Sequence, residues 1–415
     1  MKDGKKLFIM CDTFWTALYN PTVGEWTDYL DYRKLQNYNA VQFNALIQWD
    51  GGKPDSGYYP FEVNQDGTYN YYKFNEAYFE RARGLVGIAY DKGFIPIMLV
   101  LHASYTKGTW STKNHPEFII PYEQVKPLAK KIAATFKEFN PMYVPSADTD
   151  INSEDSIKYA WAALEGVKEE DPDGLCSFHL VPSADIPEDF LNSKLFDWYC
   201  PQLGHGYKDV DTGYKLIEKY YDMHIKRPIL NDEFFYEAYR HDWTKYGRFD
   251  EFDQRRTMWE CVLAGAVGGI GYGASGVWNW YRRGKESVDR NRFGTQLTAH
   301  SSMRMEGSWE GPFVRFMVET FDLYDLIPCR GMCHADEMGK QELRMAKTVD
   351  GSKMLVYMPY AIPITIEGDY SGYKFTLIEL KNKRFGSPFV HFEDGKTKVE
   401  MYDINADALL LAEKE

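Results

Sequence analysis

Eight short apolar runs recur through residue 280 of the sequence, and this pattern constrains the fold more than any other feature. Each run has the length and composition of a strand buried in a sheet, and each is followed by a stretch with the apolar periodicity of a helix. The runs are KLFIMCD, NAVQFNALI, FIPIMLVLHA, MYVPSAD, CSFHLVPSA, WYCPQLG, RPILNDE and GIGYGASGVWNW. Such alternation is typical of repeated β-α units and predicts a parallel sheet.

The intervals between these runs predict helices, from EWTDYLDYRKLQNY after the first run to FVRFMVETFDLYDL after the eighth. Eight strands in strict alternation with eight helices are what a (β/α)8 barrel requires. An open doubly wound sheet is the alternative. However, no glycine-rich phosphate loop follows the first run, where a nucleotide-binding sheet of that kind would carry one. We therefore predict an α/β fold with a TIM barrel.

The sequence changes character after residue 328. Short alternating segments such as KMLVYMPY, PITIEG and KFTLIEL are separated there by the turn-forming segments DGS, GDYSG and EDGK. Alternation with period two between such turns predicts antiparallel strands. A chain of 415 residues has room for one large barrel and a small all-β companion. We predict a barrel over residues 1–328 and a β-sandwich over residues 329–415, packed closely together.

Polar side chains gather where the predicted strands end. The carboxyl ends of all strands in a parallel barrel meet at one mouth, so residues far apart in the sequence come together there. Those that follow the runs are Asp12, Gln48, Asp50, His102, Asp148, Asp150, Gln202, His205, Asp232, Glu233, Trp278, Asn279 and Trp280. Because Asp148 ends the fourth strand and Glu233 the seventh, we expect their carboxylates to face each other. Asp150 is better explained as the N-cap of the helix that follows.

Two carboxylates that face each other across such a mouth suit the cleavage of glycosidic bonds. One acid protonates the leaving oxygen, and the other attacks the sugar or activates water. Aromatic residues, 16% of the chain, fall often in predicted loops and strand ends, where they offer a stacking surface for ring-shaped ligands. The candidates for holding the sugar are Asp12, His102, Gln202, His205 and Trp278.

Three of these candidates have a structural alternative. Asp12, His102 and His205 could equally be satisfied by hydrogen bonds inside the barrel. Side chains alternate along a strand, so only one of Trp278 and Trp280 is expected to face the mouth.

Net charge and the terminal residues narrow the possible partners. The 61 acidic residues against 48 basic ones give a net charge of -13, which repels polyanions and excludes nucleic acid as a partner. The longest apolar stretch, CVLAGAVGGIGYGASGVW, is rich in glycine and predicts a helix followed by a strand instead of a membrane span. The first residues, MKDGKKLFIM, contain no apolar signal segment, so we expect a cytoplasmic protein unless an export signal has been removed.

The sequence predicts neither a catalytic cysteine nor a metal site. The six cysteines are scattered, and we expect them to be reduced and mostly buried, with only Cys329 and Cys333 close in sequence. His102, His205 and Asp12 could in principle converge on a metal, but no HxH or HExxH spacing supports them. We predict neither a metal nor another cofactor.

Four of the eight runs resemble the apiosidase-like glycoside hydrolases, a family of retaining glycosidases built on a (β/α)8 barrel. The similar stretches are LFIMCDTFW, NPMYVPSAD, RPILNDEFFYE and GIGYGASGVWNW, which together span roughly residues 5 to 328. The β-rich segment that follows resembles the small C-terminal domain of many relatives.

The resemblance also implies roles for the two carboxylates. In the family the fourth strand ends in two small residues and an Asp that serves as acid/base, which corresponds here to Asp148 in PSAD. The seventh strand typically carries Asp-Gly-Glu with the Glu as nucleophile, which corresponds to Glu233. This chain departs from that pattern because it has Asn231 and Asp232 before the glutamate.

We therefore predict a glycoside hydrolase that cleaves O-glycosidic bonds of oligosaccharides or glycosides with retention, and whose partner is a carbohydrate substrate. Two alternatives stay open, because barrels host many chemistries. One is a carbohydrate-binding barrel without activity, and the other is a metal-dependent barrel hydrolase. The sequence does not indicate the sugar, the linkage, the anomer or the oligomeric state.

Overall fold

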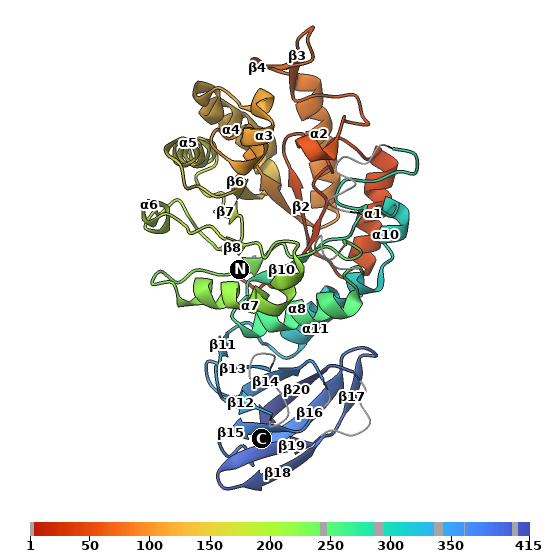
Figure 1. The fold of residues 1–415 in the computed structure, drawn as a ribbon, viewed down its shortest axis with the longest axis vertical. Helices are drawn as coiled ribbons and strands as arrows, with labels where there is room; N and C mark the ends of the chain where they lie inside the picture. Colours follow the sequence, from red (N-terminus) through yellow and green to blue (C-terminus); the bar gives the residue numbers. More distant parts are fainter. Residues whose placement is uncertain (1–3, 241–246, 286–293, 336–342, 361, 401–405) are drawn as a thin grey trace.

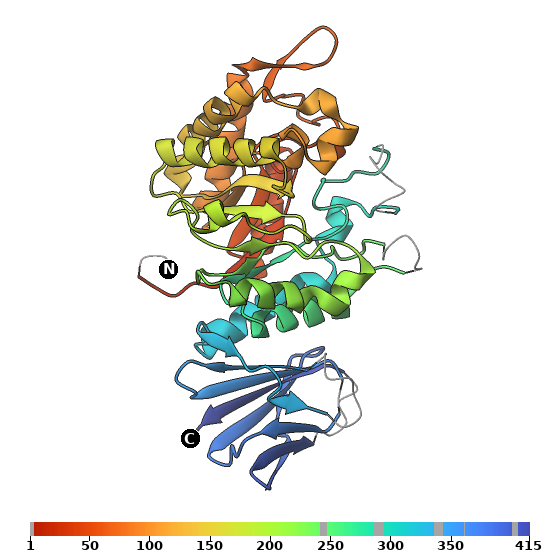
Figure 2. The same ribbon diagram turned by 60° about the vertical axis from the view of Figure 1, so that its left-hand side comes forward.

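The computed structural model describes residues 4–240, 247–285, 294–335, 343–360, 362–400 and 406–415. A barrel surrounded by helices lies at one end of the molecule, and a β-rich C-terminal part lies at the other (Figure 1). Figure 2 shows the same two parts from a second direction, with helices between them.

Eight parallel strands form the barrel and confirm the predicted TIM-barrel fold. They are hydrogen-bonded in the order β8-β7-β6-β5-β2-β1-β10-β9. The ring closes between β8 and β9, where Leu230 N donates to Tyr199 O at 3.0 Å and Leu203 N donates to Glu233 O at 2.8 Å. The strands are β1 (Ile9–Thr13), β2 (Ala40–Asn44), β5 (Ile95–Leu99), β6 (Met142–Thr149), β7 (Cys176–Leu180), β8 (Cys200–Pro201), β9 (Leu230–Asn231) and β10 (Gly269–Tyr272).

The predicted helices cover the outside of the barrel. They are α1 (Val23–Leu35), α2 (Glu76–Asp91), α4 (Tyr122–Phe136), α5 (Glu154–Glu170), α6 (Glu188–Leu191), α7 (Tyr207–Asp222), α8 (Glu251–Leu263) and α11 (Glu310–Thr320). Within the described part of the chain, no helix has both the length and the apolar character needed to cross a membrane.

Local signals set the ends of several of these helices. Helix α1 begins with a capping box in which the Thr22 side chain accepts from Glu25 N. Gly93 follows α2 at a φ of 85°, which only glycine adopts without a steric penalty. The predicted N-cap at Asp150 is wrong, since Ser153 caps α5 by accepting from Ser156 N.

Several short elements within the barrel were not predicted from the sequence. A hairpin of β3 (Phe61–Val63) and β4 (Tyr69–Phe74) projects at the end of the molecule away from the β-rich part (Figure 1). The other elements are η1 (Trp49–Gly51), η2 (Ala103–Tyr105), α3 (Trp110–Asn114), η3 (Pro116–Phe118), η4 (Lys137–Phe139), α10 (Ala299–Ser302) and η5 (Glu306–Trp309).

The C-terminal part is a sandwich of two antiparallel sheets, as predicted. Because β11 pairs with β13, its first strand begins at Leu326, slightly before the predicted boundary. The six-stranded sheet consists of β11 (Leu326–Pro328), β13 (Arg344–Thr348), β14 (Lys353–Met358), β20 (Ala408–Lys414), β16 (Tyr373–Glu379) and β17 (Arg384–Gly386). The four-stranded sheet consists of β12 (Cys333–His334), β15 (Ile364–Glu367), β19 (Lys396–Glu400) and β18 (Phe389–Glu393).

Strand β14 shows how the two parts are joined. Its alternate residues Met354 and Val356 fill the core between the two sheets. The residues between and after them, Leu355 and Tyr357, join the core of the barrel instead. Because side chains alternate across a strand, one sheet serves two hydrophobic cores. The close packing predicted for the two parts is confirmed.

Candidate active site

Glu233 follows β9 at the carboxyl end of the barrel and lies among hydrogen-bond donors. Its Oε1 accepts from Tyr236 OH at 2.6 Å and lies 2.7 Å from His205 Nε2. Its Oε2 lies 3.2 Å from His179 Nε2. Burial opposes ionisation of this carboxyl, but the hydrogen bonds from His179 and His205 outweigh it and hold its pKa well below the usual range. Glu233 is therefore a buried group that stays charged at neutral pH.

A second hydrogen bond orients the phenol that contacts Glu233. Trp15 Nε1 donates to Tyr236 OH at 2.6 Å, so the phenol accepts from the indole and donates to the carboxylate. Burial raises the pKa of Tyr236 well above its ordinary value, which keeps the phenol neutral and able to donate. The ring of Tyr236 also packs against that of His205, with centroids 4.6 Å apart.

Asp148 occupies a more open environment near the end of β6. Its side chain is 30% exposed, and its Oδ2 lies 3.6 Å from His102 Nε2. Its Oδ1 accepts from Gln202 Nε2 at 2.8 Å. The backbone has a φ of 53°, and Trp110 Nε1 donates to the Asp148 carbonyl at 2.8 Å. A left-handed backbone costs on the order of 1–2 kcal/mol for an L-residue, and such strain concentrates at functional sites.

Gln202 links the side chain of Asp148 to the backbone of Glu233. Its side chain donates to Asp148, and its backbone forms a parallel bridge with Glu233 where the barrel closes. The position of Asp148 is thus tied to the strand end that carries Glu233. The arrangement combines a buried, charged carboxylate with a partly exposed one, which is the division of environments that acid-base chemistry on two carboxylates requires.

The structure brings three predicted sugar-binding residues to these acids. His102 caps η2, and its Nδ1 lies 2.7 Å from Ser104 Oγ, which turns Nε2 toward Asp148. Gln202 contacts Asp148 directly, and His205 contacts Glu233.

The structure also separates the two tryptophans that follow β10. Trp280 stacks on Phe14 at 4.8 Å, in the cluster of rings that also contains Trp26 and Tyr29 of α1. It therefore packs toward the outer helix layer. Trp278 is 2% exposed, and its role in sugar binding stays a prediction.

Asp12 lies apart from the two acids, and its predicted role requires correction. Its Oδ2 accepts from Arg33 Nε at 2.6 Å and from Tyr29 OH at 2.6 Å, both on α1. The next residue, Thr13, accepts from Gln42 Nε2, which also reaches the Asp232 carbonyl across the barrel. Alternation along β1 thus directs Thr13 inward and Asp12 outward. We withdraw Asp12 as a sugar ligand because its carboxylate is fully buried in contacts with the outer layer.

Three residues of the site were missed in the sequence. His179 and Tyr236 both contact Glu233, and the signal for His179 was a single ionisable residue inside the apolar run CSFHLV. Asn44 shares the inward face of β2 with Gln42 because the two residues are two positions apart. It is 1% exposed, and its side-chain N and O find no hydrogen-bond partner among the described residues. A buried amide in this state has capacity for a sugar hydroxyl.

One group in the described part of the chain brings three possible metal ligands together: His179, Cys200 and Asp232, with ligand atoms within 4.8 Å of one another. However, His179 Nδ1 lies 2.8 Å from Asp232 Oδ2. Two ligands on a tetrahedral zinc, each about 2 Å from the ion, would be roughly 3.3 Å apart. The observed distance fits a hydrogen bond, so these residues do not fit a metal as placed.

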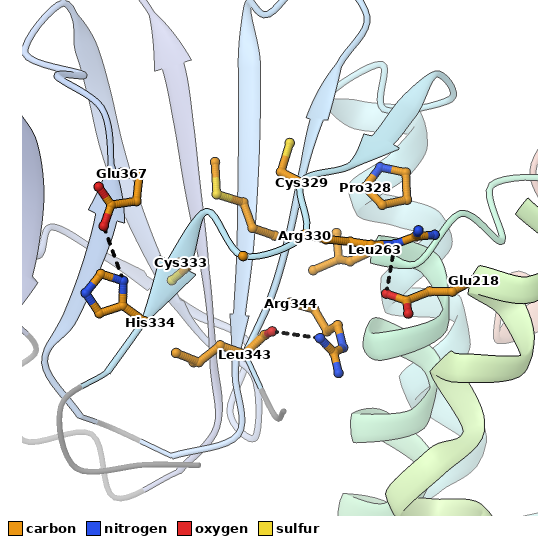
Figure 3. A pocket seen from close by; sticks show the side chains of 12 residues that line it. Glu218, Leu263, Pro328, Cys329, Arg330, Cys333, His334, Leu343, Arg344 and Glu367 are labelled. Carbon is orange, nitrogen blue, oxygen red and sulfur yellow. Dashed lines mark hydrogen bonds and ion pairs between the residues drawn. The ribbon is translucent and has the colours of Figure 1, made fainter. Parts of the chain in front are cut away.

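A separate cavity of about 390 Å³ lies between the barrel helices and the sandwich (Figure 3). Two pairs of side chains meet in its lining: Arg330 with Glu218, and His334 with Glu367. Cys329 also lines it, together with Cys333, and both are free thiols. All six cysteines are free and four are buried, which confirms the prediction from the sequence.

Comparison with known proteins identifies the family. The sequence profile described as "Apiosidase-like, catalytic domain" matches residues 1–325. The chain belongs to the apiosidase-like family. It is therefore a glycoside hydrolase, and the acids at the mouth of its barrel lie in the catalytic domain of that family. No curated protein matches the sequence at a significant level.

Solved structures similar to this apiosidase-like chain confirm its fold. A structure described as a glycoside hydrolase has a TM-score of 0.82 at 16% identity and covers 100% of this chain and 94% of its own. A family 5 glycoside hydrolase from Bacteroides vulgatus has the same TM-score and identity, with coverage of 100% and 90%. The endo-beta-1,4-mannanase from Thermotoga petrophila has a TM-score of 0.50 at 13% identity, with coverage of 96% and 92%.

Proposed function

We propose that this apiosidase-like chain is a retaining glycoside hydrolase in which Glu233 is the nucleophile and Asp148 the general acid/base. The difference between their environments is the observation that supports this assignment. Glu233 is buried and kept charged by His179 and His205, as a nucleophile must be. Asp148 is partly exposed and has room to exchange a proton with a leaving group and with water.

In the first step, Asp148 gives its proton to the glycosidic oxygen while a carboxylate oxygen of Glu233 attacks the anomeric carbon. The bond from that carbon to the leaving oxygen breaks, and a glycosyl ester of Glu233 forms. In the second step, Asp148 takes a proton from water as the water attacks the same carbon, and Glu233 leaves as a carboxylate. Gln202 would hold Asp148 in place throughout.

We propose that the substrate is an oligosaccharide or glycoside whose polar groups meet His102, Gln202, His205, Trp278 and Asn44. The family description makes apiosides one class to assay. The structural neighbours include a mannanase and an exo-beta-1,4-mannosidase, which makes β-1,4-mannosides a second class. A panel of aryl glycosides that spans both classes tests the substrate, and product release from any of them separates an enzyme from a carbohydrate-binding barrel.

The stereochemistry of the product tests the mechanism. Proton NMR of the sugar released early in the reaction should show the anomeric configuration of the substrate, because two displacements at one carbon restore it. In a complex with a ligand, the carboxyl groups of Asp148 and Glu233 should lie roughly 5–5.5 Å apart. A product of inverted configuration, together with carboxyl groups about 6.5–9.5 Å apart, would show that Glu233 is a base that activates water and not a nucleophile.

A further inference from the structure

Behind Glu233, a second buried acid contacts the same histidine. Asp232 is 0% exposed, and its Oδ2 lies 2.8 Å from Nδ1 of His179, which is itself 1% exposed. The opposite nitrogen of that ring, Nε2, lies 3.2 Å from Glu233 Oε2. One imidazole of β7 therefore lies between two carboxylates that are adjacent in the sequence.

The other groups around this histidine are neutral. Burial raises the pKa of the Cys200 and Cys11 thiols well above the ordinary value, so both keep their protons. The rings of Trp15 and His179 pack edge to face, with centroids 5.9 Å apart. Burial raises the pKa of Asp232, and its contact with the His179 ring opposes this shift. We assign the proton of this pair to His179 and the negative charge to Asp232, because the same ring also contacts Glu233 through its other nitrogen. Burial lowers the pKa of His179, but the two carboxylates outweigh this effect and raise it well above its ordinary value.

We propose that Asp232 and His179 are positioning residues that hold one proton behind the nucleophile throughout the reaction cycle. Asp232 keeps His179 as an imidazolium, and the Nε2–H of that ring remains a donor to Glu233. This inference rests on the proposed function of Glu233. It goes beyond the two-carboxylate mechanism because it gives a role to a second buried acid.

The reason is a change of charge during the reaction. When Glu233 becomes a glycosyl ester it loses its negative charge, and a buried imidazolium with no other anion would then be uncompensated, which the interior of a protein strongly disfavours. Asp232 supplies that anion, so the proton stays on His179. In the second step negative charge returns to Glu233, and the donor is already in place to receive it.

The variant Glu233→Gln provides a test, because its neutral amide mimics the charge of the ester. In protein labelled with 15N-histidine, the signals of His179 are assigned by their loss in His179→Gln. In the E233Q variant, both ring nitrogens of His179 should still carry protons at pH 7. In the double variant D232N/E233Q, the ring should titrate with a pKa below about 6.5 and therefore be neutral at pH 7, since burial disfavours a cation that has no partner.

Asp197→Asn in the E233Q background is the matched control. This acid accepts from Cys176 N at the start of β7 and pairs with Lys168, so its loss removes a charge near the same strand without a contact to His179. The His179 signals should keep both protons in this control.

A neutral His179 in E233Q, or an unchanged His179 in D232N/E233Q, would overturn the inference. The first measurement is decisive even if D232N fails to fold. Turnover gives a second readout: D232N should lower kcat roughly 10²-fold with little change in KM. E233Q that retained turnover would instead overturn the proposed role of Glu233 and leave the assignment of the proton intact.

Discussion

The mouth of the barrel and the seam between barrel and sandwich both bury charged side chains, but the partners differ. At the seam, Arg255 of α8 contacts both carboxylate oxygens of Asp407, at 2.7–3.0 Å, and Lys383 pairs with Glu310. At the mouth, Glu233 contacts two imidazoles and a phenol. In the described part of the chain, no lysine or arginine forms an ion pair with it or with Asp148.

This difference teaches how buried charge can be used. A guanidinium stays protonated at every relevant pH, so an arginine partner fixes a carboxylate permanently and serves stability. At the mouth the donors to Glu233 include phenol and imidazole groups, and the imidazolium that we assign to His179 has Asp232 as a second anionic partner, so the charge of Glu233 can change during a reaction without leaving a buried cation alone. Burial of charge alone therefore does not mark a catalytic site, and the chemistry of the partner does.

The largest effect should come from Glu233→Gln. Without a nucleophile no glycosyl ester forms, whatever the leaving group, so kcat should fall roughly 10⁴-fold or more on every substrate of the panel. Stopped assays with aryl glycosides measure this loss. Retained activity in E233Q together with lost activity in D232N would show that Asp232 is the nucleophile.

Asp148→Ala should fail in a different way. Glycosides with poor leaving groups need the acid, so kcat/KM on them should fall about 10²–10⁴-fold. Dinitrophenyl glycosides should give a burst of phenolate and then a slow rate, because the base for water attack is missing. Azide needs no base and should restore the second phase, which absorbance at the phenolate band records. If Asp148→Ala keeps near-normal activity on glycosides with poor leaving groups, the acid/base would be Asp150 and not Asp148.

At the seam, Arg255→Ala should affect stability and leave the chemistry unchanged. It leaves the carboxylate of Asp407, which is 1% exposed, without its arginine partner. The loss of one partner of a buried ion pair costs about 3–5 kcal/mol in the free energy of unfolding. Urea denaturation measures the loss, and kcat of the folded fraction should stay at the wild-type level. A change in kcat without a loss of stability would show that the seam communicates with the mouth.

Glu237 tests a third way of burying an acid, with neutral partners. It accepts from Tyr272 OH and from Gly307 N, and burial raises its pKa to about 7. Between an unfolded pKa of roughly 4.3 and this value, the folded state binds a proton that the unfolded state has released. The free energy of unfolding should therefore fall by roughly 4 kcal/mol as pH rises through this window and then stay level.

Glu237→Gln is the control for this pH dependence. Urea titrations of both proteins between pH 4 and 8 should show that the variant lacks this contribution. Parallel stability curves would mean that the pKa of Glu237 is the same in the folded and unfolded states, so that its burial does not shift it.

The smallest effect should come from an exposed ion pair. Lys6 and Asp322 lie 2.7 Å apart, but their side chains are 52% and 61% exposed. Water and salt screen such a pair, so Lys6→Ala should leave the urea midpoint of unfolding unchanged within experimental error. A loss comparable to that of Arg255→Ala would contradict the contrast between buried and exposed pairs.

The strand-helix units, the sandwich and the presence of Asp148 and Glu233 at strand ends could all be predicted from the amino-acid sequence. These features depend on periodicity along short segments, which is written in neighbouring residues. The N-cap of α5 was predicted wrongly, because Asp150 and Ser153 are both good capping residues and lie only three positions apart. The structure shows that Ser153 is the cap.

Which groups surround the two acids depends on contacts between distant parts of the chain. A shift of one residue in register turns a strand side chain to the other face, so Asp12 was assigned to the mouth although it faces Arg33. His179 meets Asp232 and Glu233 because β7, β8 and β9 are neighbours once the barrel closes. That closure joins residues far apart along the chain, and no local pattern records which side chains it brings together.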